Sequence, residues 1–429
     1  MINTIIDLLN KSEADAWEIT DSRIEGWEFY FIKHELDQNR AKNVEHIRVT
    51  VYKDSEDMKW RGTASADIAP TESVDNIKKT IDDLIFQATL VRNRHYTLNT
   101  PSEVSEIILP PFDVSEESGR FIETMSSIPE TDTEYLNSYE IFTNKIERRF
   151  VNSEGIDVTE SYPVSMLEVV VNAKNSDHEI ELYRMYDLGT CRKDDIVRDV
   201  SETMNTGKNR LVARKTPPLE NIPVIFSTSD ATHIYEYFLY NLTASFVFRK
   251  ISGFEIGKPI SDPSSAGDKV TVESNVIMEG SASNFAYDAE GARIKDLVLL
   301  DKNVPVHYWG GRMFSSYLGL EDSFIVSNWT ASGGTRTADQ LRSDDYLEVV
   351  EFSDFQVDEM TGDIFGEIRL AYWHHDGKTD PVSGGAVSGN MRDNIADMQM
   401  SKELRRYNNV MIPSVTKLSH ISIAAKEEN

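Results

Sequence analysis

The stretch from Asp230 to Lys250 constrains the fold of this chain more than any other part of the sequence. It reads DATHIYEYFLYNLTASFVFRK, and Glu236 is the only charged residue in its interior. Asp230 offers an N-cap oxygen, and Arg249 and Lys250 are cations at the opposite end, where they suit a helix C-terminus. Because a helix that is apolar on nearly every side is buried, the pattern predicts a helix through the middle of a domain.

The same stretch bears on metal chemistry. A buried helix can carry two histidines one turn apart, which is how many zinc peptidases hold their metal. His233 has no second histidine at i+4, and Ile234 follows it where a glutamate would be needed. Since a catalytic zinc requires three protein ligands and an open position, we interpret His233 as a structural histidine.

The charge balance narrows the class of partner. The 429 residues include 72 acidic and 44 basic side chains, which gives a formal charge of −28 at pH 7. Basic side chains supply much of the affinity for nucleic acid and for anionic membrane surfaces. We therefore expect this protein to bind neither nucleic acid nor membranes.

Cysteine usage and the opening segment indicate the compartment. Cys191 is the only cysteine, which excludes an intrachain disulfide and a four-cysteine zinc site. The opening segment MINTIIDLLNKSEADAW has neither a basic n-region nor a small-residue cleavage site. No stretch approaches the ~18 uninterrupted apolar residues of a membrane span. Together these features predict a cytoplasmic protein.

The first half of the chain shows two periodicities. Segments 27–34 and 46–54 alternate with a period of two, which predicts antiparallel strands. Residues 71–92 have apolar side chains at spacings of three and four, which predicts an amphipathic helix on one face of that sheet. Further helices are expected at 2–14, 115–127 and 192–205, with Gly207 closing the last of them.

A proline cluster marks the boundary between two domains. The segment RKTPPLENIPVIF (214–226) places three prolines within seven residues, which cannot continue a helix or a central strand. Glycines and short strands dominate the rest of the chain. We predict an α+β fold with two domains: an N-terminal sheet covered by helices (1–215), and a strand-rich, barrel-like C-terminal domain around the buried helix (216–429).

Several segments carry motifs of one known family, in that family's order. FVNSEGIDVTES (150–161) contains its NS-G motif, SASNFAYDAEGARIKDLVLLDKNV (281–304) its fD-EG signature, and IPSVTKLSHISIA (412–424) its closing PS segment. The long segment 357–390 has the pattern Gk-P-sGn, and FVFRK (246–250) is similar to a YRK ending. On these motifs the chain resembles the TldD/PmbA family, and is most similar to its TldE/PmbA branch. The family's older label, a modulator of DNA gyrase, fits poorly with a charge of −28.

The resemblance implies a cytoplasmic peptidase of two similar subunits, TldD and TldE, which trims peptides and matures peptide antibiotics. The TldD branch holds zinc with an HExxxH helix and later ligands that include a cysteine, whereas the TldE branch lacks this set. At the matching position this chain has only His233 and Glu236, and Cys191 precedes the helix. The resemblance therefore implies no catalytic and no metal-binding residue in this chain, and zinc in a TldD-like partner.

Five residues are candidates for contact with a peptide. Asp288 and Glu290 lie two apart, hence on one face of an extended segment, and Gly291 is expected to form a turn. Arg312 and Arg336 adjoin glycine clusters and are candidates to meet a substrate carboxylate. The alternative for the acidic pair is a solvated pair in a strongly acidic chain.

The histidine pair His374 and His375 is a second place where a metal site could be sought. Neighbouring residues on a strand point to opposite faces, so both side chains rarely reach one ion. Asp376 and Gly377 follow directly, and Asp-Gly between two strand-like segments is a hairpin signal. We therefore predict a turn here.

Three functions fit these observations. The leading hypothesis is a non-catalytic, TldE-like subunit that pairs with a TldD-like metallopeptidase, or with a second copy of itself, and acts on peptides. The second is a homodimeric peptide-binding protein without a catalytic partner. The third is a hydrolase with an unrecognised site, formed by Asp288, Glu290 and a histidine that folding brings near. The sequence does not specify the peptide.

Overall fold

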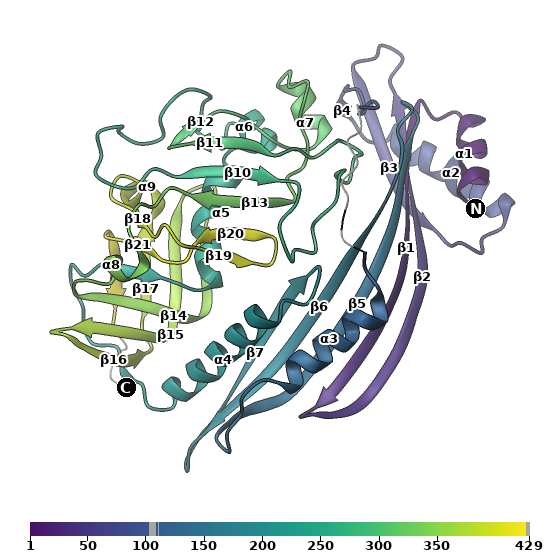
Figure 1. Ribbon diagram of the computed structural model, residues 1–429. Coiled ribbons are helices and arrows are strands. Elements are labelled where there is room, and N and C mark those ends of the chain that lie inside the picture. Colours follow the sequence, from purple (N-terminus) through teal and green to yellow (C-terminus); the bar gives the residue numbers. More distant parts are fainter. Residues whose placement is uncertain (103–108, 110, 426–429) are drawn as a thin grey trace.

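The computed structural model describes residues 1–102, 109 and 111–425, and its two strand-rich halves lie side by side (Figure 1). The described residues of the first half form one sheet with helices packed on it. Those of the second half form two further sheets around a buried helix. The fold is α+β, as the sequence predicts.

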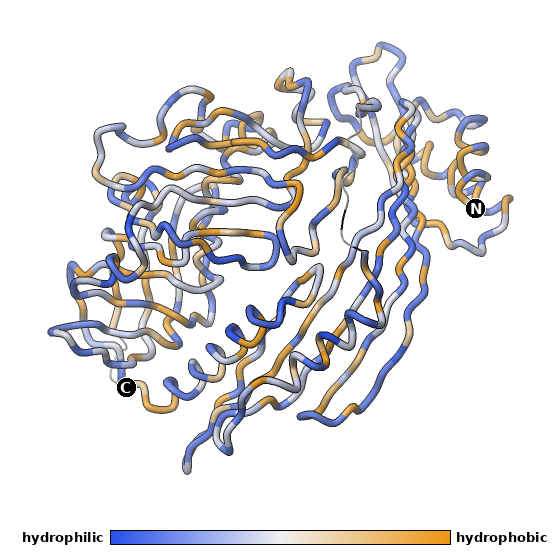
Figure 2. Tube along the Cα trace, in the orientation of Figure 1, coloured by the Kyte–Doolittle hydropathy of each residue, from blue (hydrophilic) through white to orange (hydrophobic). Residues whose placement is uncertain are grey.

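The N-terminal sheet has the strand order β4-β3-β2-β1-β5-β6-β7, and its neighbours are antiparallel. Its strands are β1 (Ala16–Ile32), β2 (Glu35–Asp54), β3 (Trp60–Ile68), β4 (Asn93–Arg94), β5 (Glu134–Asn152), β6 (Asp157–Lys174) and β7 (Glu179–Leu188). Figure 2 shows hydrophobic and hydrophilic residues alternating along the long strands. This alternation lets a sheet bury one face and keep the other polar.

Helices pack on this sheet near both of its ends. They are α1 (Ile2–Asn10), α2 (Val74–Thr89), α3 (Val114–Ser126) and α4 (Lys193–Arg210). The Ser73 side chain caps α2 by accepting a hydrogen bond from the Asn76 N–H. The buried face of α2 consists of the residues whose spacing predicts it: Ile77, Ile81, Leu84, Ile85 and Ala88.

Helix α4 corrects the expectation that Gly207 ends a helix. The helix continues through Gly207 to Arg210. A Cβ atom at Gly207 would lie 2.8 Å from the Cβ of Ala173 in β6, so only glycine lets the helix approach the sheet this closely. Because Ala173 is distant from Gly207 in the sequence, the local sequence pattern around Gly207 does not reveal this contact.

The second half contains two sheets. One has the order β12 (Val304–Pro305), β11 (Leu297–Asp301), β10 (Thr271–Asn275), β13 (Asn328–Ser332), β20 (Val410–Pro413) and β19 (Leu404–Tyr407). The other has the order β18 (Gln399–Met400), β21 (Thr416–Leu418), β9 (Val224–Phe226), β14 (Tyr346–Val357), β15 (Asp363–His375), β16 (Lys378–Ser383) and β8 (Arg214–Lys215). Strand β17 (Ala386–Asn390) pairs with β15 and with β22 (Ile421–Ala424).

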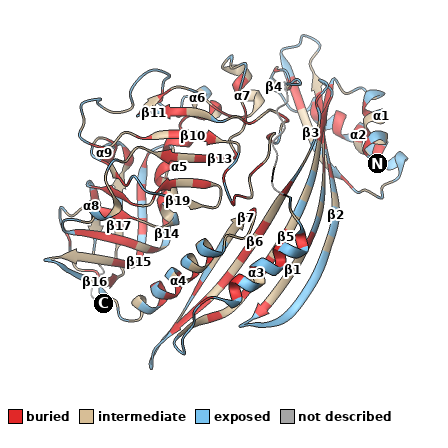
Figure 3. Cartoon of the chain, viewed as in Figure 1, coloured by how far each residue is buried: buried red, intermediate tan, exposed pale blue. Residues whose placement is uncertain are grey.

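The helices of this half are short. They are the 3₁₀ turn η1 (Ser229–Ala231), α5 (Thr232–Tyr240), α6 (Ala244–Phe248), α7 (Arg312–Tyr317), α8 (Ala338–Leu341) and α9 (Met391–Asn394). Helix α5 lies in the core that both sheets share, and Ile234, Tyr235 and Phe238 are fully buried there. Figure 3 shows buried residues gathered around α5, whereas much of β2 is exposed.

The predicted helix over 230–250 is in fact two helices, because the chain breaks at Asn241–Thr243. The Asn241 side chain donates to the carbonyl oxygens of Tyr237 (2.8 Å) and Glu359 (2.7 Å). Thr243 then caps α6. The backbone between the helices pairs with Trp309, whose N–H donates to the Leu242 carbonyl. A distant segment therefore ends the helix.

The predicted turn after the histidine pair is confirmed. Asp376 (φ +48°) and Gly377 (φ +71°) join β15 to β16, and His375 pairs with Lys378 across the hairpin. His374 stacks on Tyr346 and His375 stacks on Trp373, so the two rings contact different neighbours. No helix among the described residues is long and apolar enough to cross a membrane.

Candidate functional site

His233 and Glu236 lie one turn apart on α5 and contact each other. The Nδ1 atom of His233 is 2.8 Å from Oε2 of Glu236. This hydrogen bond raises the pKa of His233, and burial of the ring opposes it. The ring also lies 6.1 Å from that of Phe355 in β14. Each side chain is therefore a hydrogen-bond partner of the other.

These residues do not fit the zinc site of the peptidase branch that the chain resembles. In the part of the chain that the structure describes, no group of three or more histidine, cysteine, aspartate or glutamate side chains could hold a metal ion. Cys191 lies just before α4 and its sulfur is 3.3 Å from the Thr124 hydroxyl in α3.

Asp288 is buried and holds a loop together through backbone hydrogen bonds. Its Oδ1 atom accepts from the N–H groups of Glu290 and Ala292, both at 2.9 Å, and its Oδ2 atom accepts from that of Ile325 at 2.7 Å. Burial raises the pKa of Asp288, and these hydrogen bonds oppose the rise. Three backbone N–H groups of the protein thus bind this carboxylate.

Glu290 and Gly291 belong to the same loop. The carboxylate of Glu290 accepts from the Arg312 N–H at 2.6 Å, and burial raises its pKa. Gly291 has φ +73°, and a Cβ atom there would lie 2.4 Å from the Phe150 ring in β5. The loop therefore turns at Gly291 against the N-terminal sheet. The role of Asp288, Glu290 and Gly291 in peptide contact stays a prediction.

The loop forms part of a junction between the halves. The Ala286 N–H donates to Glu160 of β6 at 2.7 Å, and the Asn99 side chain donates to the Glu290 carbonyl at 3.0 Å. On the sheet side, Glu18 accepts from the Tyr52 hydroxyl at 2.7 Å. Burial raises the pKa of Glu18 to about 7, with smaller contributions from Glu290 and Asp288.

The two candidate arginines lie in different surroundings. Arg312 donates to the carbonyl oxygens of Thr97 (2.9 Å) and Leu320 (3.2 Å), next to the Glu290 loop. Arg336 donates to the Gln399 side chain (2.9 Å) and lies 3.8 Å from a carboxylate oxygen of Asp268. The fold brings Arg312 to the acidic loop and places Arg336 with other residues.

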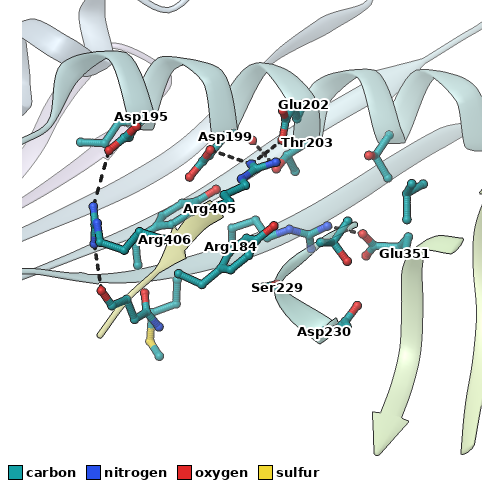
Figure 4. A pocket seen from close by; sticks show the side chains of 18 of the residues that line it. Arg184, Asp195, Asp199, Glu202, Thr203, Ser229, Asp230, Glu351, Arg405 and Arg406 are labelled. Atoms are coloured by element: carbon teal, nitrogen blue, oxygen red, sulfur yellow. Dashed lines mark hydrogen bonds and ion pairs between the residues drawn. The ribbon is translucent and has the colours of Figure 1, made fainter. Parts of the chain in front are cut away.

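Sequence reasoning missed a groove between the two halves. Figure 4 shows side chains from β7, α4, η1, β14 and β19 around a cavity of about 300 Å³. A second cavity of about 320 Å³ shares five of the same lining residues: Glu202, Thr206, Thr228, Val350 and Arg405. The two cavities form one groove, which we name the central groove.

Ion pairs cross the central groove from one half to the other. Arg405 of β19 donates to Asp199 (2.8 Å) and Glu202 (2.5 Å) of α4. Arg184 of β7 pairs with Glu351 of β14. The groove walls therefore belong to both halves and are held together by charge.

Asp230 lies at one end of the central groove, in η1, three residues before His233. Burial raises the pKa of Asp230, and the nearby carboxylate of Glu351 raises it further. The groove thus offers guanidinium donors and carboxylate acceptors side by side, which suits a ligand with polar groups of both kinds, such as a peptide backbone and its termini. The charged residues of the central groove come singly from five elements of a charge-rich chain, so they form no motif that the sequence could reveal.

Comparisons with known proteins agree with this fold. Residues 219–425 match the sequence profile of the PmbA/TldA metallopeptidase C-terminal domain. No curated protein sequence matches the chain. Among solved structures, TldE from Thermococcus kodakarensis superposes with a TM-score of 0.78 at 16% identity, over 98% of this chain and 100% of that one.

Two further structures are similar over the whole chain. A proposed modulator of a DNA gyrase from Thermotoga maritima has a TM-score of 0.77 at 14% identity, covering 99% of each chain. A proposed modulator of DNA gyrase from Bacteroides thetaiotaomicron has a TM-score of 0.76 at 14% identity, covering 99% of this chain and 98% of that one. At these identities the likeness concerns the fold. The profile match assigns residues 219–425, the second half of the chain, to the TldD/PmbA family.

Proposed function

We propose that this chain is a TldE-like, non-catalytic subunit of a TldD/TldE-type metallopeptidase complex that cleaves or matures peptides. One observation carries the proposal. The α5 position where the peptidase branch would hold its metal has His233 and Glu236 bonded to each other at 2.8 Å. Neither side chain meets a third ligand among the described residues. The zinc of the complex would then belong to a TldD-like partner in the cytoplasm.

The central groove supports a role in handling peptides. It begins at η1, directly ahead of α5, and both halves of the chain line it. Its arginine and carboxylate side chains can bind the termini and polar groups of a peptide without cleaving it. In this proposal the subunit shapes the access path, and the partner performs the hydrolysis.

The test is reconstitution. The chain alone, the cognate TldD-like protein alone and an equimolar mixture are compared by gel filtration, by zinc content after dialysis and by cleavage of an unstructured peptide. We expect one larger species in the mixture, zinc that follows the TldD-like protein, and cleavage that needs both chains. The proposal fails if no complex forms, or if the chain alone binds about one zinc and cleaves the peptide.

Three variants make the test specific to residues. His233→Ala and Glu236→Gln remove the pair on α5, and neither should reduce cleavage by the mixture if the pair has no role in chemistry. Asp288→Asn addresses the hydrolase alternative, because activity of the chain alone that this change abolishes would assign the site there. A chain that forms only a self-dimer and binds peptide without cleaving it would favour the homodimeric alternative.

A further inference from the structure

Exposed and half-buried aromatic rings, with two exposed arginines, form a strip over β3, β4, α7 and α6, which lie at the upper edge of the molecule in Figure 1. We name this surface the aromatic–arginine strip. Its residues are Trp60, Arg94, Tyr317, Phe248, Phe314 and Arg249. Both halves of the chain contribute to it, because Trp60 and Arg94 come from the N-terminal sheet and the rest from the second half.

Each member of the strip contacts the next. Trp60 and Arg94 are partners across β3 and β4. The guanidinium carbon of Arg94 lies 5.6 Å from the centre of the Tyr317 ring, and that ring is 5.0 Å from the Phe248 ring. The Phe314 ring is 5.8 Å from that of Phe248. The guanidinium carbon of Arg249 lies 4.9 Å from the centre of the Phe314 ring.

Part of the strip is open to solvent, and within the described residues its two arginines have no carboxylate partner. Trp60 is 43% exposed and Phe248 is 37% exposed. Across the described ranges, neither Arg94 nor Arg249 forms an ion pair, although the chain has 72 acidic side chains to offer. Each guanidinium lies instead over an aromatic ring, an arrangement that leaves its N–H groups free to bind a carboxylate.

We propose that the aromatic–arginine strip is the surface on which the peptidase partner docks, through a segment that presents carboxylates beside apolar side chains. The proposal rests on the proposed function and adds the location and chemistry of the contact. Tyrosine, tryptophan and arginine are the residues that most often dominate binding energy at the centre of an interface. Burying the strip under an acidic segment would pair both guanidinium groups and cover the rings together.

The charge of the strip and of the whole chain favours a carboxylate-bearing partner segment over a second copy of this chain or a nucleic acid. If two copies met through the strip about a two-fold axis, the Arg94 and Arg249 side chains of both copies would come together. The strip itself has no carboxylate to pair with them, so their positive charges would repel. A single-stranded nucleic acid could stack on the rings, but the net charge of −28 opposes its phosphates. The same net charge acts on a carboxylate-bearing protein segment, but such a segment needs only the two carboxylates that pair with Arg94 and Arg249, whereas a nucleic acid brings one negative charge with every nucleotide.

The experiment measures the affinity of the full-length chain for the cognate TldD-like protein by titration calorimetry, at low and at high salt. The test variants are the double charge reversal R94E/R249E and the ring deletion Phe248→Ala. The matched controls are R48E/R369E, which reverses two other exposed arginines, and Phe365→Ala, which removes an exposed ring of β15. Circular dichroism and thermal unfolding establish that every variant is folded.

We expect R94E/R249E and Phe248→Ala each to weaken binding by about tenfold or more, and the controls by less than about threefold. The loss for the charge reversal should be largest at low salt. Equal affinity of wild type and strip variants would overturn the docking proposal and leave the proposed function intact. Absence of any complex with wild type would overturn both. A strip-dependent change in self-association, or binding of an oligothymidylate that only the strip variants lose, would also overturn it by assigning the strip to a different occupant.

Discussion

Glu18 is a carboxyl group that the fold places in a buried junction. It accepts a hydrogen bond from Tyr52, and the loop carrying Glu290 and Asp288 faces it from the second half. The Tyr52 hydrogen bond and the positive charge of Arg61 both lower the pKa of Glu18 and so partly oppose the effect of burial. Burial and the two carboxylates therefore favour the protonated form of Glu18 in the folded protein.

The first prediction follows from this pKa. Since the pKa of Glu18 is raised from 4.5 to about 7, the folded chain retains a proton that the unfolded chain loses. The resulting stabilisation is fully present below the unfolded pKa, and is lost as pH rises through the folded pKa. We expect wild type to lose on the order of 2 kcal/mol relative to Glu18→Gln between about pH 5 and pH 8.

Urea denaturation of both proteins at several pH values measures this difference. The glutamine can still accept from the Tyr52 hydroxyl, so the comparison isolates the charge. Glu25→Gln, at an exposed position of the same strand, serves as the control and should follow wild type. Parallel pH profiles for wild type and Glu18→Gln would contradict the prediction.

Gly291 supplies a second prediction at the scale of one residue. Its φ of +73° and the Phe150 ring, which would lie 2.4 Å from a Cβ atom at this position, both exclude a side chain. Gly319 has nearly the same φ, +71°, with nothing within 4 Å. We expect Gly291→Ala to lower the free energy of unfolding by roughly 1–3 kcal/mol more than Gly319→Ala, because only the former adds a clash. If thermal unfolding showed the same loss of stability for both variants, the loop around Gly291 would have moved to accommodate the added methyl group.

At the scale of elements, the sequence pattern predicts a helix or strand correctly where contacts between residues close in the chain determine it. The alternation in β1 and β2 and the spacing in α2 are set by neighbours along the chain, and these elements form as expected. The break between α5 and α6 depends on Trp309, and the continuation of α4 depends on Ala173. Asp288 likewise binds the N–H of Ile325, 37 residues away. Such contacts leave no periodicity to detect.

The break gives a third prediction. Thr243 is the N-cap of α6, and its hydroxyl accepts from the Phe246 N–H. We expect Thr243→Ala to destabilise the chain by about 1 kcal/mol, because the N–H of a helix start loses its partner. Thr243→Ser keeps the hydroxyl and should restore most of the loss. Denaturant titration of the three proteins checks this, and a serine variant as unstable as the alanine variant would argue against capping.

At the scale of the molecule, the central groove is the feature that the sequence does not predict. Its walls come from β7 and α4 on one side and β14 and β19 on the other, so it exists only once the halves have met. Asp199 is the most informative residue in it, since burial raises its pKa while Arg405 and Arg198 oppose the rise. Burial therefore disfavours the charged form of Asp199, whereas its ion pairs favour that form.

The fourth prediction is a coupling across the groove. Arg405→Ala leaves Asp199 without its partner from the other half, and we expect a loss of roughly 1–3 kcal/mol in the free energy of unfolding. Asp199→Ala in the same chain should recover part of that loss, because the more buried carboxylate is removed and only the exposed Glu202 still lacks Arg405. Unfolding of the two single variants and the double variant closes the cycle. Additive losses would mean that the pair does not link the halves.

Strand β8 has a mechanical consequence. Its residues, Arg214 and Lys215, end the first half of the chain, yet they pair with β16 in the sheet of the second half. At the opposite end, the Asp288 loop is fastened to β5 and β6 through Phe150 and Glu160. The two halves are thus attached to each other at two separate places, which opposes rotation about a single hinge. Widening of the central groove would therefore require the elements that line it to bend, or one of these two attachments to break.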